Sequence, residues 1–201
     1  MTGRGAAPDT QEMSSMAYRV LLVEDNLGDA ELLQERLSES VFASFEVIHV
    51  NRLAAAVGAL SAGGVDVVIL DLNLPDSSGL ATLTQVCAAS HAAPVIVVSG
   101  IVDAQMRREA VAAGAEDVLT KEESNSYLFS RSILFVIERN RAREQQRQLE
   151  KLLEVTPDAI VVASVAGEVL YVNDTALTLF NRTRDELFAA VEAKVHEGDW
   201  Q

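Results

Sequence analysis

The chain has 201 residues, 49% of them hydrophobic, and a formal net charge of −14. A surface this acidic repels nucleic acid and anionic membranes, which argues against nonspecific binding to either. Its single cysteine, Cys87, excludes an internal disulfide and a thiolate zinc site, and it fits a reducing cytoplasm. No apolar run is long enough to span a bilayer, and residues 1–16 are expected to form a disordered tail.

Short apolar segments alternate with helical patterns along most of the chain. Runs rich in β-branched residues indicate buried strands, and apolar residues at helical spacing indicate the helices. The expected strands are 18–23, 45–50, 65–70, 94–98 and 117–120, and the expected helices are 26–40, 53–62, 81–89, 103–113 and 126–154. This alternation predicts an α/β fold with a doubly wound five-stranded parallel sheet, in which right-handed crossovers bring the carboxyl ends of the strands to one edge.

Polar residues follow four of the predicted strands. Glu24 and Asp25 end the first, Asp71 the third, Ser99 the fourth and Lys121 the fifth. The residues at 74–79, with a proline, an aspartate and a glycine, predict a loop after the third strand. One aspartate before a loop is as easily a turn cap as a ligand, but four strands that bring polar groups to the same edge favour a functional site.

The residue types at this edge suit phosphoryl chemistry. Three carboxylates at close range repel one another, so a cation is needed to keep them ionised, and oxygen ligands suit Mg²⁺ or Mn²⁺ better than zinc. Beside a divalent ion, Asp71 is a carboxylate nucleophile able to form an acyl phosphate, with Lys121 and the Ser99 hydroxyl contacting the phosphate. Two alternatives stay open: the acids only bind magnesium, or Lys121 pairs structurally with Asp71.

Residues 18 to about 125 resemble the receiver domain of two-component response regulators. The motifs that carry the resemblance are 22–26 (Leu-Val-Glu-Asp-Asn), 69–76 (Ile-Leu-Asp-Leu-Asn-Leu-Pro-Asp), 97–100 (Val-Val-Ser-Gly) and 119–121 (Leu-Thr-Lys). The resemblance implies a flavodoxin-like receiver over residues 17–125. It also implies that Asp71 accepts a phosphoryl group from a partner histidine kinase or phosphotransfer protein.

The same resemblance assigns roles to the other residues at the edge. It implies Mg²⁺ held by Asp25, Asp71 and the backbone carbonyl of Asn73, with Glu24 acting largely through water. Lys121 would contact the phosphate, and Ser99 would be the switch hydroxyl that moves toward it.

Three positions concern the switching, the loop after Lys121 and the lifetime of the phosphoryl group. Val118 stands where the family usually has its switch aromatic, so the coupled movement of hydroxyl and aromatic is in question. Glu122 stands where the family commonly has a proline, so we expect a trans peptide bond after Lys121 because a cis bond without proline costs about 3 kcal/mol. In the family, the position two residues after the switch hydroxyl influences access of the hydrolytic water, so the resemblance implies that apolar Ile101 gives a long-lived phosphoryl group.

The segment from Ser124 to Glu154 contains no proline or glycine, and its second half is polar and strongly helix-forming. We therefore expect residues 126–154 to form a fifth helix that continues beyond the receiver as a signalling helix. Its expected partner is the same helix of a second subunit in a parallel coiled coil, which is weak because Arg141, Glu144 and Gln148 fall on the seam. A solvated helical linker is the alternative.

Residues 155–201 predict a small α+β segment. Apolar runs at 159–163 and 169–172 read as a hairpin, and Asn173 and Asp174 read as the start of a short helix. Residues 150–188 resemble the beginning of a PAS sensor domain, on the motifs 152–160, 167–173 and 184–187. The segment is too short to enclose a ligand pocket, so it is expected to be a partial PAS domain with no complete haem or flavin site. It is either a piece of a longer protein or a degenerate PAS remnant that serves in dimerisation. The scattered histidines, His49, His91 and His196, are expected to be neither ligands nor bases.

The sequence thus predicts a cytoplasmic phosphoacceptor module, homodimeric through its long helix and PAS-like segment, with Mg²⁺ as its cofactor. No ATP- or GTP-binding motif indicates a kinase or cyclase within it, so it is not expected to be an enzyme beyond its own phosphorylation and dephosphorylation. Two other hypotheses remain. In the first, the chain is the amino end of a larger hybrid histidine kinase or cyclase. In the second, it is a pseudo-receiver scaffold that acts without phosphorylation.

Overall fold

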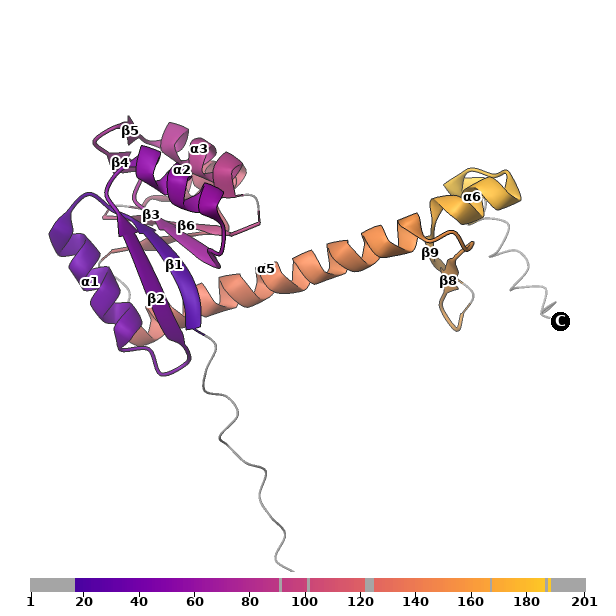
Figure 1. Ribbon diagram of the computed structural model, residues 1–201, viewed down its shortest axis with the longest axis horizontal. Helices are drawn as coiled ribbons and strands as arrows, with labels where there is room; N and C mark the ends of the chain where they lie inside the picture. The colour runs from indigo at the N-terminus through magenta and orange to yellow at the C-terminus, as the bar shows by residue number, and fades with distance from the viewer. Residues whose placement is uncertain are drawn as a thin grey trace, which may run out of the picture. The chain divides into compact units, whose positions relative to one another are not determined.

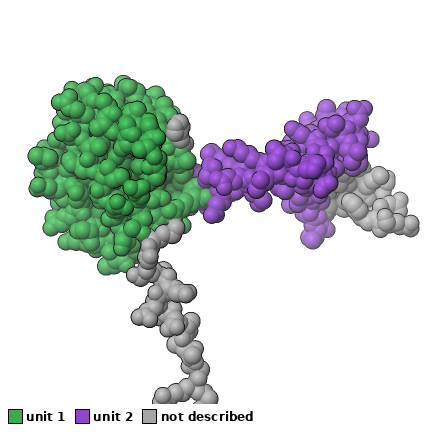
Figure 2. All heavy atoms as spheres, in the orientation of Figure 1, with its two compact units in different colours: residues 1–141 green, residues 142–201 purple. Residues whose placement is uncertain are grey.

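The computed structural model describes residues 17–90, 92–100, 102–121, 125–166, 168–186 and 188 (Figure 1). The chain forms two compact units, residues 1–141 and residues 142–201 (Figure 2). These are called unit 1 and unit 2 below, and each is described by itself. Among the described residues, no helix combines the length and the apolar character needed to cross a membrane.

Unit 1 is built on a five-stranded parallel sheet with the strand order β2-β1-β3-β6-β7. Its strands are β1 (Ala17–Val23), β2 (Ser44–Val50), β3 (Val67–Leu70), β6 (Val95–Ser99) and β7 (Asp117–Thr120). The helices between and after them are α1 (Leu27–Ser38), α2 (Leu53–Ala62), α3 (Leu80–Ser90), α4 (Ala104–Ala112) and α5 (Ser126–Val155). The predicted doubly wound parallel sheet is confirmed, and so is the long fifth helix.

Successive residues of each strand pack into two different cores, one on each face of the sheet. Leu21 and Val23 of β1 pack with the apolar side chains of α2, α3 and α4. Val20 and Leu22 pack on the opposite face with α1 and with the first half of α5, where Phe129 is fully buried. Because both faces are covered, β3 is buried at all four positions, as its continuous apolar run predicts.

The loop expected after β3 contains a two-residue antiparallel ladder between β4 (Asn73–Leu74) and β5 (Ser77–Ser78). The turn between them brings Asp76 to the start of α2, whose own N-cap, Arg52, makes no side-chain capping bond. The carboxylate of Asp76 instead accepts hydrogen bonds from the amides of Leu53 (2.9 Å) and Ala54 (3.1 Å). A turn far along the chain therefore satisfies the amides that a helix leaves unpaired at its start.

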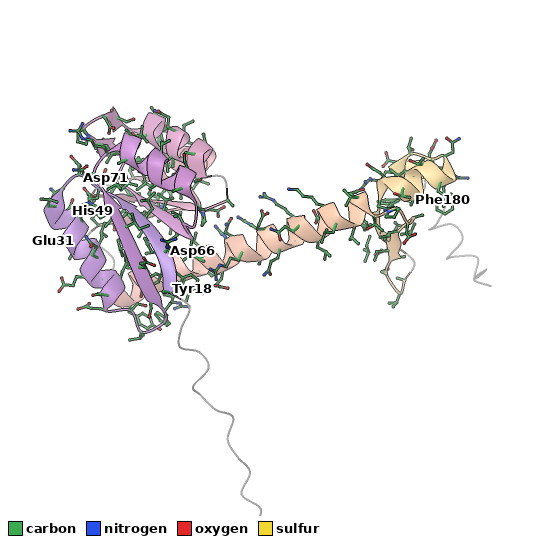
Figure 3. The ribbon with its side chains drawn as sticks, in the orientation of Figure 1. Tyr18, Glu31, His49, Asp66, Asp71 and Phe180 are labelled. Atoms are coloured by element: carbon green, nitrogen blue, oxygen red, sulfur yellow. The ribbon has the colours of Figure 1, made fainter. Side chains whose placement is uncertain are left out.

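The last turn of α5 within unit 1 is tied to the sheet by polar contacts. Four consecutive residues of the helix each contact a residue at or just before the start of a different strand. The pairs are Glu138 with Tyr18 (2.8 Å), Arg139 with Glu116, Asn140 with the carbonyl of Ala92 (2.6 Å), and Arg141 with Asp66 (2.8 Å). Figure 3 labels Tyr18 and Asp66 beside this part of the helix. These four pairs, called the α5 collar below, link the helix to the strand starts at the point where unit 1 ends.

Unit 2 contains the end of α5, the antiparallel strands β8 (Val161–Ala163) and β9 (Val169–Val172), and helix α6 (Asp174–Phe180). The predicted hairpin and short helix are confirmed. The side chain of Asn173, which is fully buried, joins these elements. It donates to the carbonyls of Leu153 and Asp158 and accepts from the amides of Ile160 and Ala176, at 2.9–3.0 Å.

Asp76→Ala is predicted to lower the midpoint of thermal unfolding, because two amides of α2 lose their acceptors. Asp76→Asn keeps one acceptor oxygen and should retain part of the stability. The two amides hold the pKa of Asp76 below its ordinary value of 3.8, so the stabilisation is complete above that pH and is lost as the pH falls below it. Calorimetry of the three proteins at about pH 7 and about pH 3 tests this. An Ala effect equally large at both pH values would contradict it.

Asn173→Ala is predicted to destabilise unit 2 by about 1–3 kcal/mol, because it leaves buried carbonyl and amide groups without partners. Asn173→Asp keeps the acceptor for the amides of Ile160 and Ala176 but loses both donors, so it serves as the matched variant. Amide hydrogen exchange at these two residues reports the local opening. Unchanged exchange in Asn173→Ala would show that this side chain does not hold the unit together.

Candidate functional site

The ammonium group of Lys121 lies among three carboxylates. Its Nζ is 2.7 Å from Oε2 of Glu24, 2.6 Å from Oδ2 of Asp29 and 2.6 Å from Oδ2 of Asp71. Lys121 directly follows β7, and its amide donates to the carbonyl of Ser99 at the end of β6 (3.0 Å). The carboxyl ends of four strands and the first turn of α1 therefore meet around one lysine.

Glu24 is the most deeply buried of the three acids, with 1% of its side chain exposed. Its amide extends the ladder of β1 by donating to the carbonyl of Val50 (3.0 Å), and its Oε1 accepts from the amide of Asn26 (3.1 Å). Oε2 accepts no hydrogen bond among the described residues, so its partner is the ammonium of Lys121. Burial raises the pKa of Glu24, and the nearby charge of Asp71 raises it further, while Lys121 opposes both.

Asp71 follows β3 and still belongs to the sheet ladder, because its amide donates to the carbonyl of Val23 (2.9 Å). Its two carboxylate oxygens have different partners. Oδ1 accepts from the amide of Asn73 (2.8 Å), which turns the chain away from the sheet, and Oδ2 pairs with Lys121. The side chain is 12% exposed, so Asp71 is held in place and still reaches solvent. Figure 3 labels Asp71 at this edge of the sheet.

The charges at this edge do not balance. Burial lowers the pKa of Lys121, but the hydrogen bonds and charges of the three carboxylates outweigh it and hold that pKa above its ordinary value. One permanent positive charge thus faces three carboxylates, with Asp25 adding a fourth acid next to Glu24. Excess negative charge and oxygen-only donors fit a divalent cation such as Mg²⁺. Among the residues that the structure describes, no group of three His, Cys, Asp or Glu side chains already surrounds a single metal position.

The structure brings most of the sequence-predicted site residues together. Glu24 and Asp71 contact Lys121 directly, Ser99 contacts it through the backbone, and Asn73 contacts Asp71 through its amide. Asp25 is exposed at the end of β1 and takes part in none of the described ion pairs with Lys121. These positions are compatible with the predicted roles, which remain predictions.

Sequence reasoning missed Asp29. This residue lies in the first turn of α1, where an acid is also explained by the helix dipole. Asn26 caps α1 by accepting from the amides of Gly28 and Asp29, so the first turn is held next to the end of β1. The sequence signal that could have found it is its position. Asp29 follows Asp25 by four residues and lies in the first turn of a helix that begins at the site edge.

The positions linked to switching and the histidines have different outcomes. Val118 is fully buried in the core and pairs with Val97 in the sheet, so no exposed side chain is present at the position of the switch aromatic. Ile101 and Glu122 lie outside the described residues, as do His91 and His196. His49 has Nε2 2.8 Å from the carbonyl of Glu24, which supports the loop after β1.

Comparison with known proteins identifies the family. The model of the response regulator receiver domain matches residues 20–132, which is more than half of the chain. The chain belongs to the response regulator receiver family. A second family model, the PAS domain, matches residues 147–199, so the receiver is followed by a PAS domain match, as the motifs predict.

Similar proteins agree with this assignment. The transcriptional regulatory protein YrkP of Bacillus subtilis is 30% identical over 138 residues, 69% of this chain and 58% of YrkP. The signal receiver domain of a Vibrio parahaemolyticus protein is 25% identical, with a TM-score of 0.57 over 65% of this chain and 97% of that one. A Burkholderia pseudomallei response regulator, solved with a phosphorylated aspartic acid, calcium and citrate, is 23% identical, with a TM-score of 0.50 over 65% of this chain and 72% of that one. The chain spans 50–62% of the length of the first curated relatives it matches.

Lys121→Met is predicted to lower the free energy of unfolding by about 1–3 kcal/mol in metal-free protein, because the buried Glu24 and Asp71 lose their shared cation. Mg²⁺ should then raise the unfolding midpoint of the variant more than that of the wild type, since a divalent ion supplies the missing charge. The matched control is Lys151→Met, an exposed lysine in unit 2. Calorimetry with and without Mg²⁺ checks both expectations. Equal midpoints for the two variants would contradict them.

Proposed function

We propose that the protein is a phosphoacceptor module of two-component signal transduction and that Asp71 is its phosphorylation site. The observation that carries the proposal is the pairing of Asp71 with Lys121 beside the buried Glu24. This pairing places a partly exposed carboxylate nucleophile next to a fixed positive charge and an acidic, cation-seeking pocket. The family assignment supports it, and the phosphorylated aspartic acid in the Burkholderia relative shows the chemistry on the same fold.

The donor in this proposal is a phosphohistidine of a partner histidine kinase or phosphotransfer protein. A carboxylate oxygen of Asp71 attacks the phosphorus, an O–P bond forms, and the N–P bond of the phosphohistidine breaks. The electron pair of that bond returns to the imidazole nitrogen. Lys121 holds a phosphoryl oxygen through its ammonium, and the Ser99 hydroxyl donates to another.

The proposed cofactor is Mg²⁺. The residues that would hold it are Asp25, Asp71 and the carbonyl of Asn73, with Glu24 acting through water. When bound, the ion neutralises charge on the phosphoryl oxygens. The excess of carboxylates over cations at the site supports this assignment, and so does the calcium in the Burkholderia structure.

The proposed output runs through α5. The α5 collar ties this helix to unit 1 by polar contacts, and the helix continues without interruption to Val155. Beyond the collar, the apolar side chains of Leu149, Leu152 and Val155 are exposed. Apolar residues left exposed on a helix favour a partner surface, so we propose that a second copy of the chain pairs through the long helix and the PAS-like unit. The long helix would then report the state of Asp71 to the dimer.

Two alternatives from the sequence remain to be separated from this proposal. A larger hybrid histidine kinase or cyclase that contains this chain would use the same receiver chemistry, since the proposal concerns only the part described. A scaffold that never carries phosphate is favoured by one observation, the buried Val118 in place of a switch aromatic. Phosphorylation of Asp71 decides between a working receiver and such a scaffold.

Asp71→Ala is predicted to abolish phosphorylation by acetyl phosphate in the presence of Mg²⁺, because it removes the nucleophile. Intact-mass spectrometry should show one added phosphoryl group on the wild type and none on the variant. Asp66→Ala, which changes a carboxylate just before β3, at the opposite end of that strand from Asp71, is the matched control and should still gain the phosphoryl group. Wild-type protein that gains no mass would overturn the phosphoacceptor proposal and favour the scaffold.

The same proteins test the output. Light scattering with Mg²⁺ and beryllofluoride, a phosphoryl mimic, should show a change in mass or shape for the wild type and none for Asp71→Ala. An unchanged dimer in both proteins would mean that the helix and unit 2 associate without regard to the state of Asp71.

A further inference from the structure

The Lys121 ammonium already has three carboxylate partners, because it donates hydrogen bonds to Asp29 and Asp71 and forms an ion pair with Glu24. An ammonium group has three N–H donors, and three carboxylates lie at 2.6–2.7 Å from Nζ. A phosphoryl group on Asp71 brings new oxygens that also require a donor from Lys121. The phosphoryl oxygens and the three carboxylates therefore compete for one ammonium group.

The burial of the three acids decides which contact weakens. Glu24 has 1% of its side chain exposed, and Oε2 depends on Lys121, so losing this contact would leave a buried charge unpaired. Asp71 is the residue that carries the phosphoryl group, so it stays next to Lys121. Asp29 is 37% exposed, and water can replace the ammonium there at little cost. Asp29 is thus the partner that Lys121 can leave most easily.

Helix α1 holds Lys121 at two points. Asp29 binds the ammonium, and Arg36, seven residues later and therefore on the same side of the helix, donates from Nη1 to the carbonyl of Lys121 (2.8 Å). The contact of Arg36 with the backbone does not depend on where the ammonium points. The Lys121 side chain can therefore turn from Asp29 to another acceptor while the hydrogen bond from Arg36 to the Lys121 carbonyl remains.

We propose that Asp29 is a positioning residue that holds the Lys121 ammonium in the unphosphorylated protein and gives it up to the phosphoryl group. Asp29 and the phosphoryl group compete for the Lys121 ammonium, so Asp29 slows the phosphorylation of Asp71. Its release on phosphorylation frees the first turn of α1 from the site. This inference rests on the proposed function of Asp71.

The experiment measures the rate at which the full chain gains a phosphoryl group from acetyl phosphate with Mg²⁺. Asp29→Asn should accelerate this step on the order of three- to tenfold, because Lys121 no longer has to leave a carboxylate and one negative charge near the donor is removed. Asp29→Glu keeps the carboxylate and should return the rate toward that of the wild type. Glu31→Gln is the matched control: it removes a charge two residues away, on an exposed side of α1 (Figure 3), and should leave the rate unchanged.

A second background tests whether Asp29 acts through Lys121. In Lys121→Met protein, Asp29→Asn should no longer accelerate the reaction, whereas an effect of charge alone would persist there and overturn the inference. A metal-free measurement accompanies the rates. The shifts in unfolding midpoint caused by Asp29→Asn and Lys121→Met should be non-additive, while those of Glu31→Gln and Lys121→Met should add.

The outcomes separate the two proposals. If wild-type protein gains no phosphoryl group, the function proposed for Asp71 fails and this inference fails with it. If the wild type is phosphorylated and Asp29→Asn reacts at the rate of Glu31→Gln or more slowly, only the role of Asp29 is overturned. Additive midpoint shifts for Asp29→Asn and Lys121→Met would likewise overturn it, because the two side chains would then not interact.

Discussion

The ion pairs of Lys121 are the interaction on which the rest of the site depends. Glu24, Asp71 and Lys121 come from three different strands, and Asp29 comes from a helix, so no local stretch of chain holds them together. The parallel sheet brings the three strand ends to one edge, and the ammonium then offsets the repulsion among the acids that this arrangement creates. A buried glutamate such as Glu24 costs free energy unless it is paired, so the fold and the lysine stabilise each other.

The sequence is most informative where a local pattern determines the structure. The burial of β3 follows from its apolar run, and the positions of Glu24, Asp71 and Lys121 follow from the rule that parallel strands end at the same edge. Asp103, the N-cap of α4, accepts from the amide of Met106, and α2 ends at Gly63, which has a φ of 77°. In each of these cases, the few residues around the position contain the necessary information.

Other features depend on contacts between distant segments, which local sequence patterns do not predict. Asp76 caps a helix that begins 23 residues earlier, and a short β-turn would have explained it equally well. An acid such as Asp29 is ordinary in a first helical turn. Only its contact with the Lys121 ammonium, which the sequence does not reveal, shows that it belongs to the site. Asn173 was predicted as a helix cap, which it is, but its donors also reach the end of α5 and the loop before β8.

The two halves of the α5 segment within unit 1 are held by different forces, and this difference bears on how a change at the site could reach the helix. Phe129, Ile133 and Ile137 are buried in the core on one face of the sheet, where packing resists displacement. The collar pairs are partly exposed, and pairs of this kind are each worth only about 1 kcal/mol or less. The site lies at the strand ends and the collar at the strand starts of the same sheet. The collar is therefore the part of the attachment that can rearrange at small cost, while the buried residues keep the helix in place on unit 1.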